Sequence, residues 1–166
     1  MKLKIRIAAL IVLLPIGVFL WHKLFPGDDV LIRRRLETLA QAASFPSDES
    51  PLAKIGNAAQ LANCFTSDGE VDVSPWGYQR VVVKGRDELR QAALGARSAV
   101  ASLTVGFESV EVTLGPGRDD AAVSLSVFGQ TSQQMERQSQ ALRLELRKVG
   151  GDWFIRRATT VEYLKP

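Results

Sequence analysis

The chain has 166 residues, of which 46% are hydrophobic and 23% are charged, so it fits one compact domain and is not a disordered chain. Its formal net charge of +3 is unevenly distributed. Residues 1–25 hold four basic and no acidic side chains, which leaves 17 of the 21 basic residues against all 18 acidic ones. The rest of the chain lacks the positive charge that binds phosphate backbones, and we expect no nucleic-acid partner.

The first 27 residues predict a membrane anchor. Basic residues precede an uncharged apolar run from residue 7 to 21, a pattern typical of a signal peptide or a signal anchor. Cleavage needs small residues after such a run, whereas His22 is followed by Lys, Leu, Phe and Pro. We therefore expect residues 7–25 to remain and to cross a bacterial inner membrane once, within a signal-anchor segment of residues 1–27.

One cysteine and one histidine limit the chemistry of the predicted domain, residues 28–166. Cys64 alone excludes an intrachain disulfide and a thiolate-bound metal cluster, and we expect it in the core. His22 lies in the predicted anchor, so the domain has no histidine for a metal site or a Ser-His-Asp triad. We expect no metal ion and no cofactor.

A first helix is predicted over residues 30–44, with Asp28 or Asp29 as its cap. Apolar residues at spacings of three and four define its buried face: Ile32, Leu36, Leu39 and Ala43. The arginines at positions 33–35 form either a solvated helix face or, because they closely follow the anchor, a contact with lipid phosphates.

Two further helices follow. Ser50 and Pro51 are typical of an N-cap and a first helical residue. The helix that they begin is predicted to bury Leu52, Ile55, Ala59 and Ala62. The third helix starts from a turn at residues 85–88, whose acidic side chains complement the helix dipole. Its predicted buried stripe is Leu89, Ala93, Ala96 and Val100.

The remaining pattern predicts strands. A first strand follows a turn at residues 67–69, and a Val-rich strand covers residues 80–84. From residue 103 the chain is predicted to form a meander of long strands. Its apolar face slips by one residue near Glu108 and Ser109, which indicates a β-bulge. The last strand begins at Trp153, after a Gly-Gly-Asp turn.

This order of elements resembles the nuclear transport factor 2-like superfamily, which includes ketosteroid-isomerase-like and polyketide-cyclase-like proteins. The segments that carry the resemblance are residues 62–73, the Gly-Arg helix start in residues 83–89, and the Gly-Asp-Trp hairpin in residues 147–155. The resemblance covers residues 28–164 and implies an α+β fold. In it, three helices of the N-terminal half pack in a strongly curved antiparallel sheet, a cone-shaped roll.

The resemblance also locates a possible catalytic base. In the isomerase-like members, an aspartate general base lies late in the first strand, just before a proline. Matching along the strand puts Val73 there, and counting back from Pro75 puts Ser74 there, and neither can act as a carboxylate base. Asp72 is adjacent but on the opposite strand face, so it is either a displaced base or a solvent-facing acid.

Several large side chains could line the interior of the cone, either as core or as walls of a ligand pocket. They are Trp76, Tyr78, Phe107, Phe128, Trp153 and Tyr163. Arg157 shares strand parity with Trp153 and Ile155, so regular alternation points it inward, where it would need a carboxylate or an anionic ligand. The alternative is that the register changes before Arg157, or that its side chain reaches the rim.

Three functions are compatible with these features. The leading hypothesis is a membrane-tethered, non-catalytic interaction or assembly module, similar in layout to the anchored periplasmic components of secretion systems with this kind of fold. A protein partner or a second copy would dock on the sheet face that carries Arg143, Glu145 and Arg147. The alternative is a domain that binds a small apolar or anionic molecule in the cone. An isomerase-like or dehydratase-like enzyme is the third.

The orientation of the anchor gives a testable prediction. The basic tail before the apolar run favours a cytoplasmic N-terminus, although the arginines at positions 33–35 partly offset this charge. We expect the domain on the extracytoplasmic, periplasmic side. Protease added to intact spheroplasts should then digest residues 28–166, and a fully protected domain would contradict this orientation.

Overall fold

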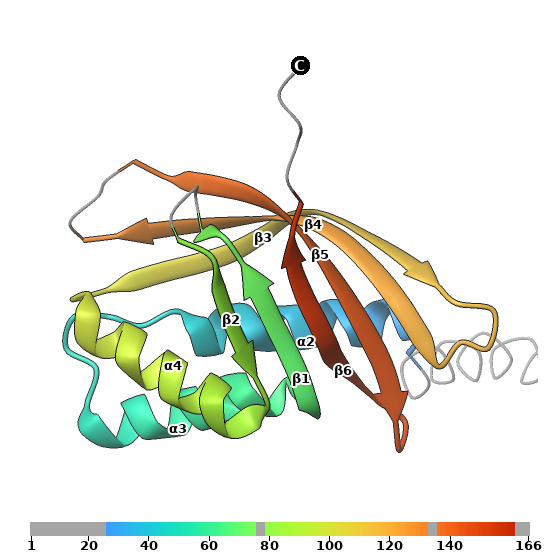
Figure 1. Cartoon of the computed structure of the whole chain (residues 1–166), viewed down its shortest axis with the longest axis horizontal. Coiled ribbons are helices and arrows are strands. Elements are labelled where there is room, and N and C mark those ends of the chain that lie inside the picture. Colours follow the sequence, from blue (N-terminus) through green and yellow to red (C-terminus); the bar gives the residue numbers. More distant parts are fainter. Residues whose placement is uncertain (1–25, 76–78, 133–135, 162–166) are drawn as a thin grey trace, which may run out of the picture.

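The computed structural model describes residues 26–75, 79–132 and 136–161, which form three helices and a six-stranded sheet (Figure 1). The elements follow in the order α2 (Asp28–Ala43), α3 (Pro51–Asn63), β1 (Phe65–Val73), β2 (Val81–Lys84), α4 (Arg86–Ala99), β3 (Leu103–Leu114), β4 (Asp120–Thr131), β5 (Gln138–Val149) and β6 (Asp152–Thr160). The strand order in the sheet is β2-β1-β6-β5-β4-β3. The predicted α+β class and element order are confirmed.

The sheet is mixed, so the predicted antiparallel sheet is wrong in one pairing. β6 runs parallel to β1, because the β5–β6 hairpin returns the chain beside the first strand in the same direction. β1 also begins at Phe65, immediately after α3, and not after a turn at residues 67–69. Residues 67–69 instead lie within β1, where its pairing with β6 is irregular, because the register between the two strands shifts between Phe65 and Glu70.

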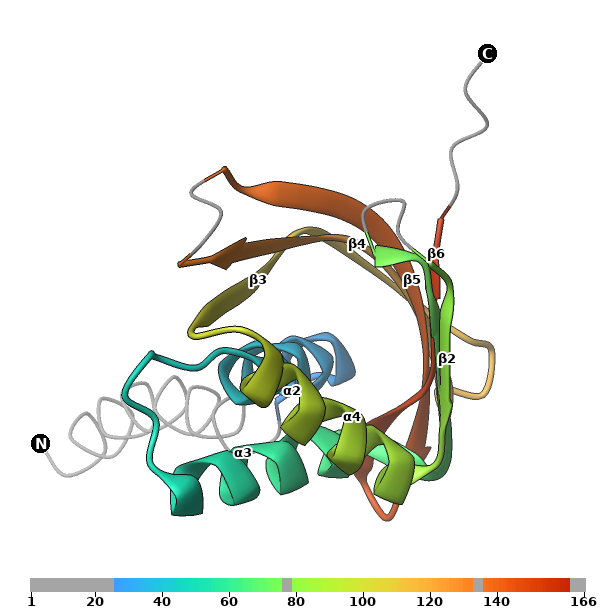
Figure 2. The same cartoon turned by 60° about the vertical axis from the view of Figure 1, so that its left-hand side comes forward.

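The sheet curls around the helices, which lie on its concave side (Figure 2). The predicted bulge in β3 contributes to this curvature. The register of β3 against β4 shifts between Glu108 and Glu111, and Ser109 has a φ of 51°. The bulge lets apolar residues on both sides of it face one core, because Phe107 and Val110 pack against the same buried cluster.

The helices bury smaller faces than their patterns predict. On α2, Ile32 and Leu36 are buried as expected. On α3, Leu52 and Ile55 are 81% and 58% exposed, so their predicted burial is wrong. The predicted burial of Ala62 is confirmed, and α3 turns Ala58 inward beside it, because α3 packs against the two other helices and short side chains allow a close approach.

A buried ion pair joins the three helices. Arg97, in the last turn of α4, places its Nε 3.3 Å from an oxygen of Glu49, and the two side chains are only 2% and 3% exposed. Arg97 also donates to the carbonyl oxygen of Ala42 at the end of α2. Asn57 on α3 donates to Glu49 at 2.7 Å. Burial of Arg97 replaces the predicted burial of Ala96, which is exposed.

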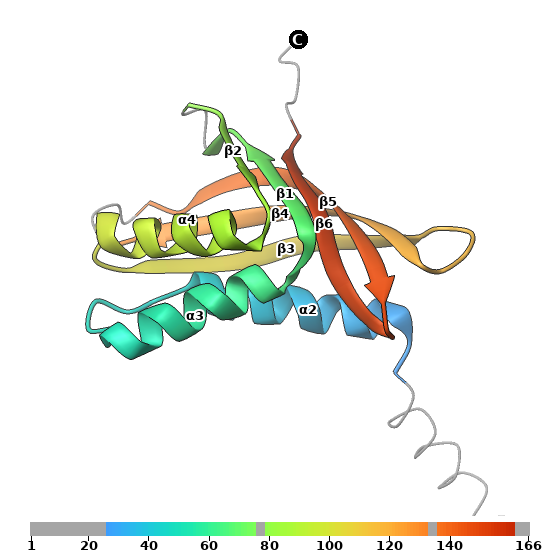
Figure 3. The same cartoon turned by 60° about the horizontal axis from the view of Figure 1, so that its bottom comes forward.

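The start of α2 is tied to the sheet. Its N-cap is Gly27, so the predicted acidic cap is wrong, and Asp28 lies in the first turn. The Asp28 carboxylate accepts hydrogen bonds from Lys148 (2.7 Å) and Trp153 (3.2 Å), and the bond from Lys148 contributes most to lowering the pKa of Asp28. This contact holds α2 beside the β5–β6 hairpin (Figure 3).

The predicted anchor, residues 7–25, lies outside the described residues. Within the described ranges, no helix combines the length and the apolar character that a bilayer-spanning helix needs.

Removing one partner of the buried ion pair should strongly destabilise the domain. Arg97→Met leaves the Glu49 carboxylate buried without its cation, and we expect the free energy of unfolding to fall by about 3–5 kcal/mol. Urea unfolding of the full chain measures this. The control is Arg90→Met on the same helix, whose pair with Asp87 is exposed, with an expected loss below about 1 kcal/mol. Equal losses for the two variants would contradict the account.

Candidate functional site

An apolar cavity of about 330 Å³ lies between the helices and the concave face of the sheet. Its described lining comes from all three helices and all six strands, and every lining side chain is Ala, Val, Leu or Phe. The helices contribute small side chains at key points, Ala43 from α2 and Ala92 and Ala93 from α4. Short side chains opposite a curved sheet leave space that a larger residue would fill.

The cavity offers no described group for acid–base chemistry. Proton transfer requires a titratable side chain within hydrogen-bond reach of the substrate, and none lines the cavity among residues 26–75, 79–132 and 136–161. Val73, at one of the two positions of the isomerase-like base, lines the cavity as a hydrocarbon. The backbone of Ser74, at the other position, donates to Thr160 (2.9 Å) and accepts from Gln140 (2.8 Å).

Asp72 is paired with a neighbouring arginine and does not line the cavity. Both oxygens of its carboxylate accept from the Arg80 guanidinium at 2.6 Å. This bidentate pair is the main cause that holds the pKa of Asp72 below its ordinary value. Val71 and Val73 line the cavity on either side of Asp72 in β1, so strand alternation turns Asp72 to the other face.

The predicted aromatic residues separate into different places. Phe107 lines the cavity. Trp153 is instead a core residue, 1% exposed, whose indole N–H donates a hydrogen bond to Asp28. Phe128 lies opposite Gly106 on β3, where any larger side chain would collide with its ring, and the Arg137 guanidinium lies 3.6 Å from the ring centroid. Trp76, Tyr78 and Tyr163 lie outside the described residues.

The inward orientation predicted for Arg157 is wrong, and the alternative of a register change is confirmed. The register of β6 against β5 shifts so that Ile155 pairs with Leu146 and Arg157 with Glu145. This extra residue moves the inward position from residue 157 to Ala158, which lines the cavity. Arg157 is 47% exposed and lies 3.3 Å from Glu70. The sequence holds one signal for this change. Arg156 and Arg157 are consecutive, so regular alternation would turn one of the two charges into the core.

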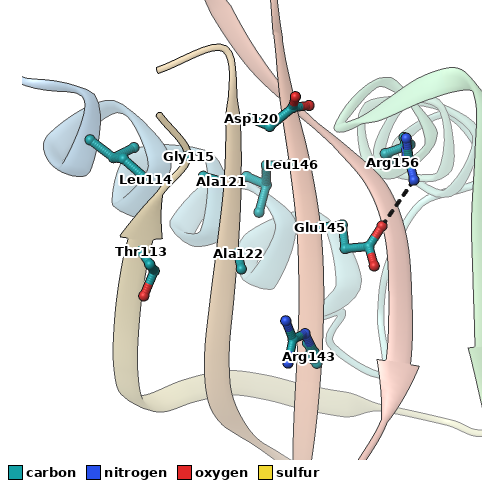
Figure 4. Close-up of a pocket in the computed structure, with 10 residues that line it drawn as sticks. All are labelled: Thr113, Leu114, Gly115, Asp120, Ala121, Ala122, Arg143, Glu145, Leu146 and Arg156. Atoms are coloured by element: carbon teal, nitrogen blue, oxygen red, sulfur yellow. Dashed lines mark hydrogen bonds and ion pairs between the residues drawn. The ribbon is translucent and has the colours of Figure 1, made fainter. Parts of the chain in front are cut away.

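The outer face of the sheet is polar and carries a second pocket of about 410 Å³ (Figure 4). Within it, Glu145 points toward Arg156, with 3.1 Å between the paired atoms. Arg143 lines the same pocket, and none of the ion pairs in the described parts of the chain includes it. This is the face predicted to bind a partner or a second copy. That interaction stays a prediction.

The comparisons with known proteins agree with this architecture. A family described as the SnoaL-like domain matches residues 34–159, which is most of the chain. The chain belongs to this family. No curated protein matches it.

Solved structures similar to this SnoaL-like domain support its fold. Three come from Novosphingobium aromaticivorans. An NTF2-like protein with a cystatin-like fold is 20% identical, with a TM-score of 0.55 over 80% of this chain and 84% of that one. A putative aromatic ring hydroxylase is 18% identical (TM-score 0.62, 84% and 90%). A putative scytalone dehydratase is 15% identical (TM-score 0.54, 81% of each). At these identities the likeness establishes the NTF2-like fold.

Titration of Asp72 tests whether this SnoaL-like domain has kept a base there. We expect the pKa of Asp72, followed by carboxyl NMR, to lie below the ordinary value of 3.8, and Arg80→Gln to raise it toward that value. The control variant Arg90→Gln should leave it unchanged. A pKa of Asp72 above the ordinary value, as a general base requires, would contradict the assignment.

Proposed function

We propose that this SnoaL-like domain binds a small apolar molecule without transforming it, and does so at a membrane surface. The observation that carries the proposal is the cavity of about 330 Å³ with a wholly apolar described lining. Its volume is near the lower end of about 300–1,000 Å³ for small-molecule sites. Binding there would gain about 0.8 kcal/mol for each methylene group removed from water.

The same lining argues against catalysis. Two proteins of similar fold are named as a putative hydroxylase and a putative dehydratase. Fold alone does not transfer an activity, since chemistry depends on the side chains of the site. Val73 faces the cavity at a position where the isomerase-like members have a carboxylate, and Asp72 is paired with Arg80 outside it. The described cavity can hold a molecule but has no group to move its protons.

The membrane location rests on the sequence of residues 1–27. A tether at residues 7–25 would keep the domain beside a bilayer, where apolar molecules are concentrated, and would raise its effective concentration there. Docking of a protein partner or a second copy on the sheet remains the other predicted function. Binding in the cavity is favoured because the cavity is already formed in the folded chain.

Photolabelling tests the proposal. An uncharged alkane that carries a diazirine is added to the full chain in detergent, irradiated, and located by mass spectrometry. We expect labels on cavity residues of β3 and β5, such as Val105, Phe107 and Leu142. Ala93→Phe fills the cavity and should lower this labelling at least about tenfold, which corresponds to about 1.4 kcal/mol of binding free energy.

The matched control is Ala96→Phe, which adds the same ring to an exposed position of the same helix and should leave the labelling unchanged. Val105→Phe is a second filling variant, in case Ala93→Phe does not fold, which circular dichroism shows. Labels confined to residues 7–25, or equal labelling of the filled and control variants, would contradict cavity binding.

A further inference from the structure

Two arginines from different helices each lie near the same aromatic ring. The guanidinium carbon of Arg35, on α2, lies 4.9 Å from the centroid of the Phe154 ring on β6. The guanidinium carbon of Arg86, the first residue of α4, lies 5.7 Å from the same centroid. All three residues are half-buried, so the two positive charges are partly withdrawn from water.

These two arginines differ from the other described arginines in having neither a carboxylate partner nor full exposure. Nine arginines lie within ion-pair distance of an acid: Arg33, Arg80, Arg90, Arg97, Arg118, Arg137, Arg147, Arg156 and Arg157. Arg34 and Arg143 have no such partner among the described residues, but both are exposed to water. Arg35 and Arg86 are thus the half-buried arginines that lack a counterion within the described ranges.

Among the residues placed by the structure, the immediate neighbours of Arg35 and Arg86 do not balance the charge of these two side chains. Phe154 attracts cations through its ring electrons but carries no net charge. Arg86 donates from its Nε to the carbonyl oxygen of Phe65 at 2.9 Å. The ionisable group beside Arg35 is the Cys64 thiol, and burial raises the pKa of this thiol despite the opposing effect of Arg35. Cys64 therefore stays neutral near pH 7 and supplies no anion.

The nearby acid on β1 faces other arginines. The basic side chains whose charges act on the carboxylate of Asp68 are Arg147 and Arg156. No ion pair within 4 Å links Asp68 to Arg35 or Arg86 in the described chain.

We propose that Arg35 and Arg86 form a binding site for a phosphate group on the ring of Phe154. Guanidinium groups match phosphate oxygens with two parallel N–H donors, and a phosphate dianion would balance two arginines. The site is distinct from the apolar cavity, because none of its three residues lines that cavity. It goes beyond binding of an apolar molecule and does not depend on it.

The three arginines at positions 33–35 differ in their surroundings. Arg33 is engaged within the fold, through Asp29 at 3.0 Å and the carbonyl oxygen of Val110 at 3.1 Å. Arg34 is exposed, and Arg35 reaches the Phe154 ring. The phosphate could belong to a soluble molecule or to a lipid headgroup beside the predicted anchor, and the two arms of the experiment separate these sources.

In the first arm, thermal unfolding of the full chain in a non-ionic detergent is followed as inorganic phosphate replaces chloride at constant ionic strength. We expect phosphate to raise the Tm of the wild-type chain. Arg35→Gln and Arg86→Gln should each weaken the apparent affinity at least about tenfold. Arg34→Gln and Arg143→Gln remove unpaired exposed arginines and should leave it unchanged. Arg35→Lys, which retains the charge, should keep part of the binding if a Gln variant does not fold.

In the second arm, the full chain is placed in nanodiscs of phosphatidylcholine alone or with added phosphatidic acid, which exposes a phosphate monoester. Stabilisation by phosphatidic acid but not by free phosphate, again lost in Arg35→Gln, would identify a lipid headgroup as the source. Stabilisation by free phosphate would support a soluble ligand. The proposal is overturned if neither arm stabilises the wild-type chain, or if the Arg34 and Arg143 variants lose as much as the Arg35 variant.

Discussion

The buried ion pair between Arg97 and Glu49 is the constraint on which the helical layer depends. Both charges are removed from water, so separating them would leave an uncompensated charge in the interior. Together with the bond from Arg97 to Ala42, the pair fixes the end of α2, the start of α3 and the end of α4 in one arrangement. Ala93 lies one turn before Arg97, and in this arrangement its methyl group faces the cavity.

The sheet forms the other side of the cavity, and two register shifts in its strands decide which side chains line it. An extra residue at the bulge in β3, and another where β6 pairs with β5, each change which side chains face inward. The second irregularity places Ala158 inside and leaves Arg157 with Glu70 outside. The described lining of the cavity is therefore apolar, because the backbone register keeps Arg157 out of it. This register supports the proposal that the domain binds an apolar molecule in the cavity.

The sequence predicted features that depend on neighbouring residues. The helix start at Ser50 and Pro51 and the bulge near Ser109 follow from local patterns, and both are present. The parallel β1–β6 pairing and the burial of Arg97 depend on distant parts of the chain, so periodicity alone did not show them. Leu52 illustrates the same limit, since an apolar stripe does not say which face a neighbouring helix will cover. For the site, Phe107 was named among the aromatic side chains that could line the interior, whereas the lining position of Ala158 depends on the register change in β6.

Methyl NMR of the full chain with labelled alanines can detect an apolar molecule in the cavity. We expect an uncharged hydrocarbon such as decane to shift the methyl signals of Ala43, Ala93 and Ala158, which line the cavity. The signals of Ala96, exposed on α4, and Ala122, in the polar pocket of the outer sheet face, should stay in place. Unchanged cavity methyls at saturating hydrocarbon, or equal shifts of all five, would contradict binding in the cavity.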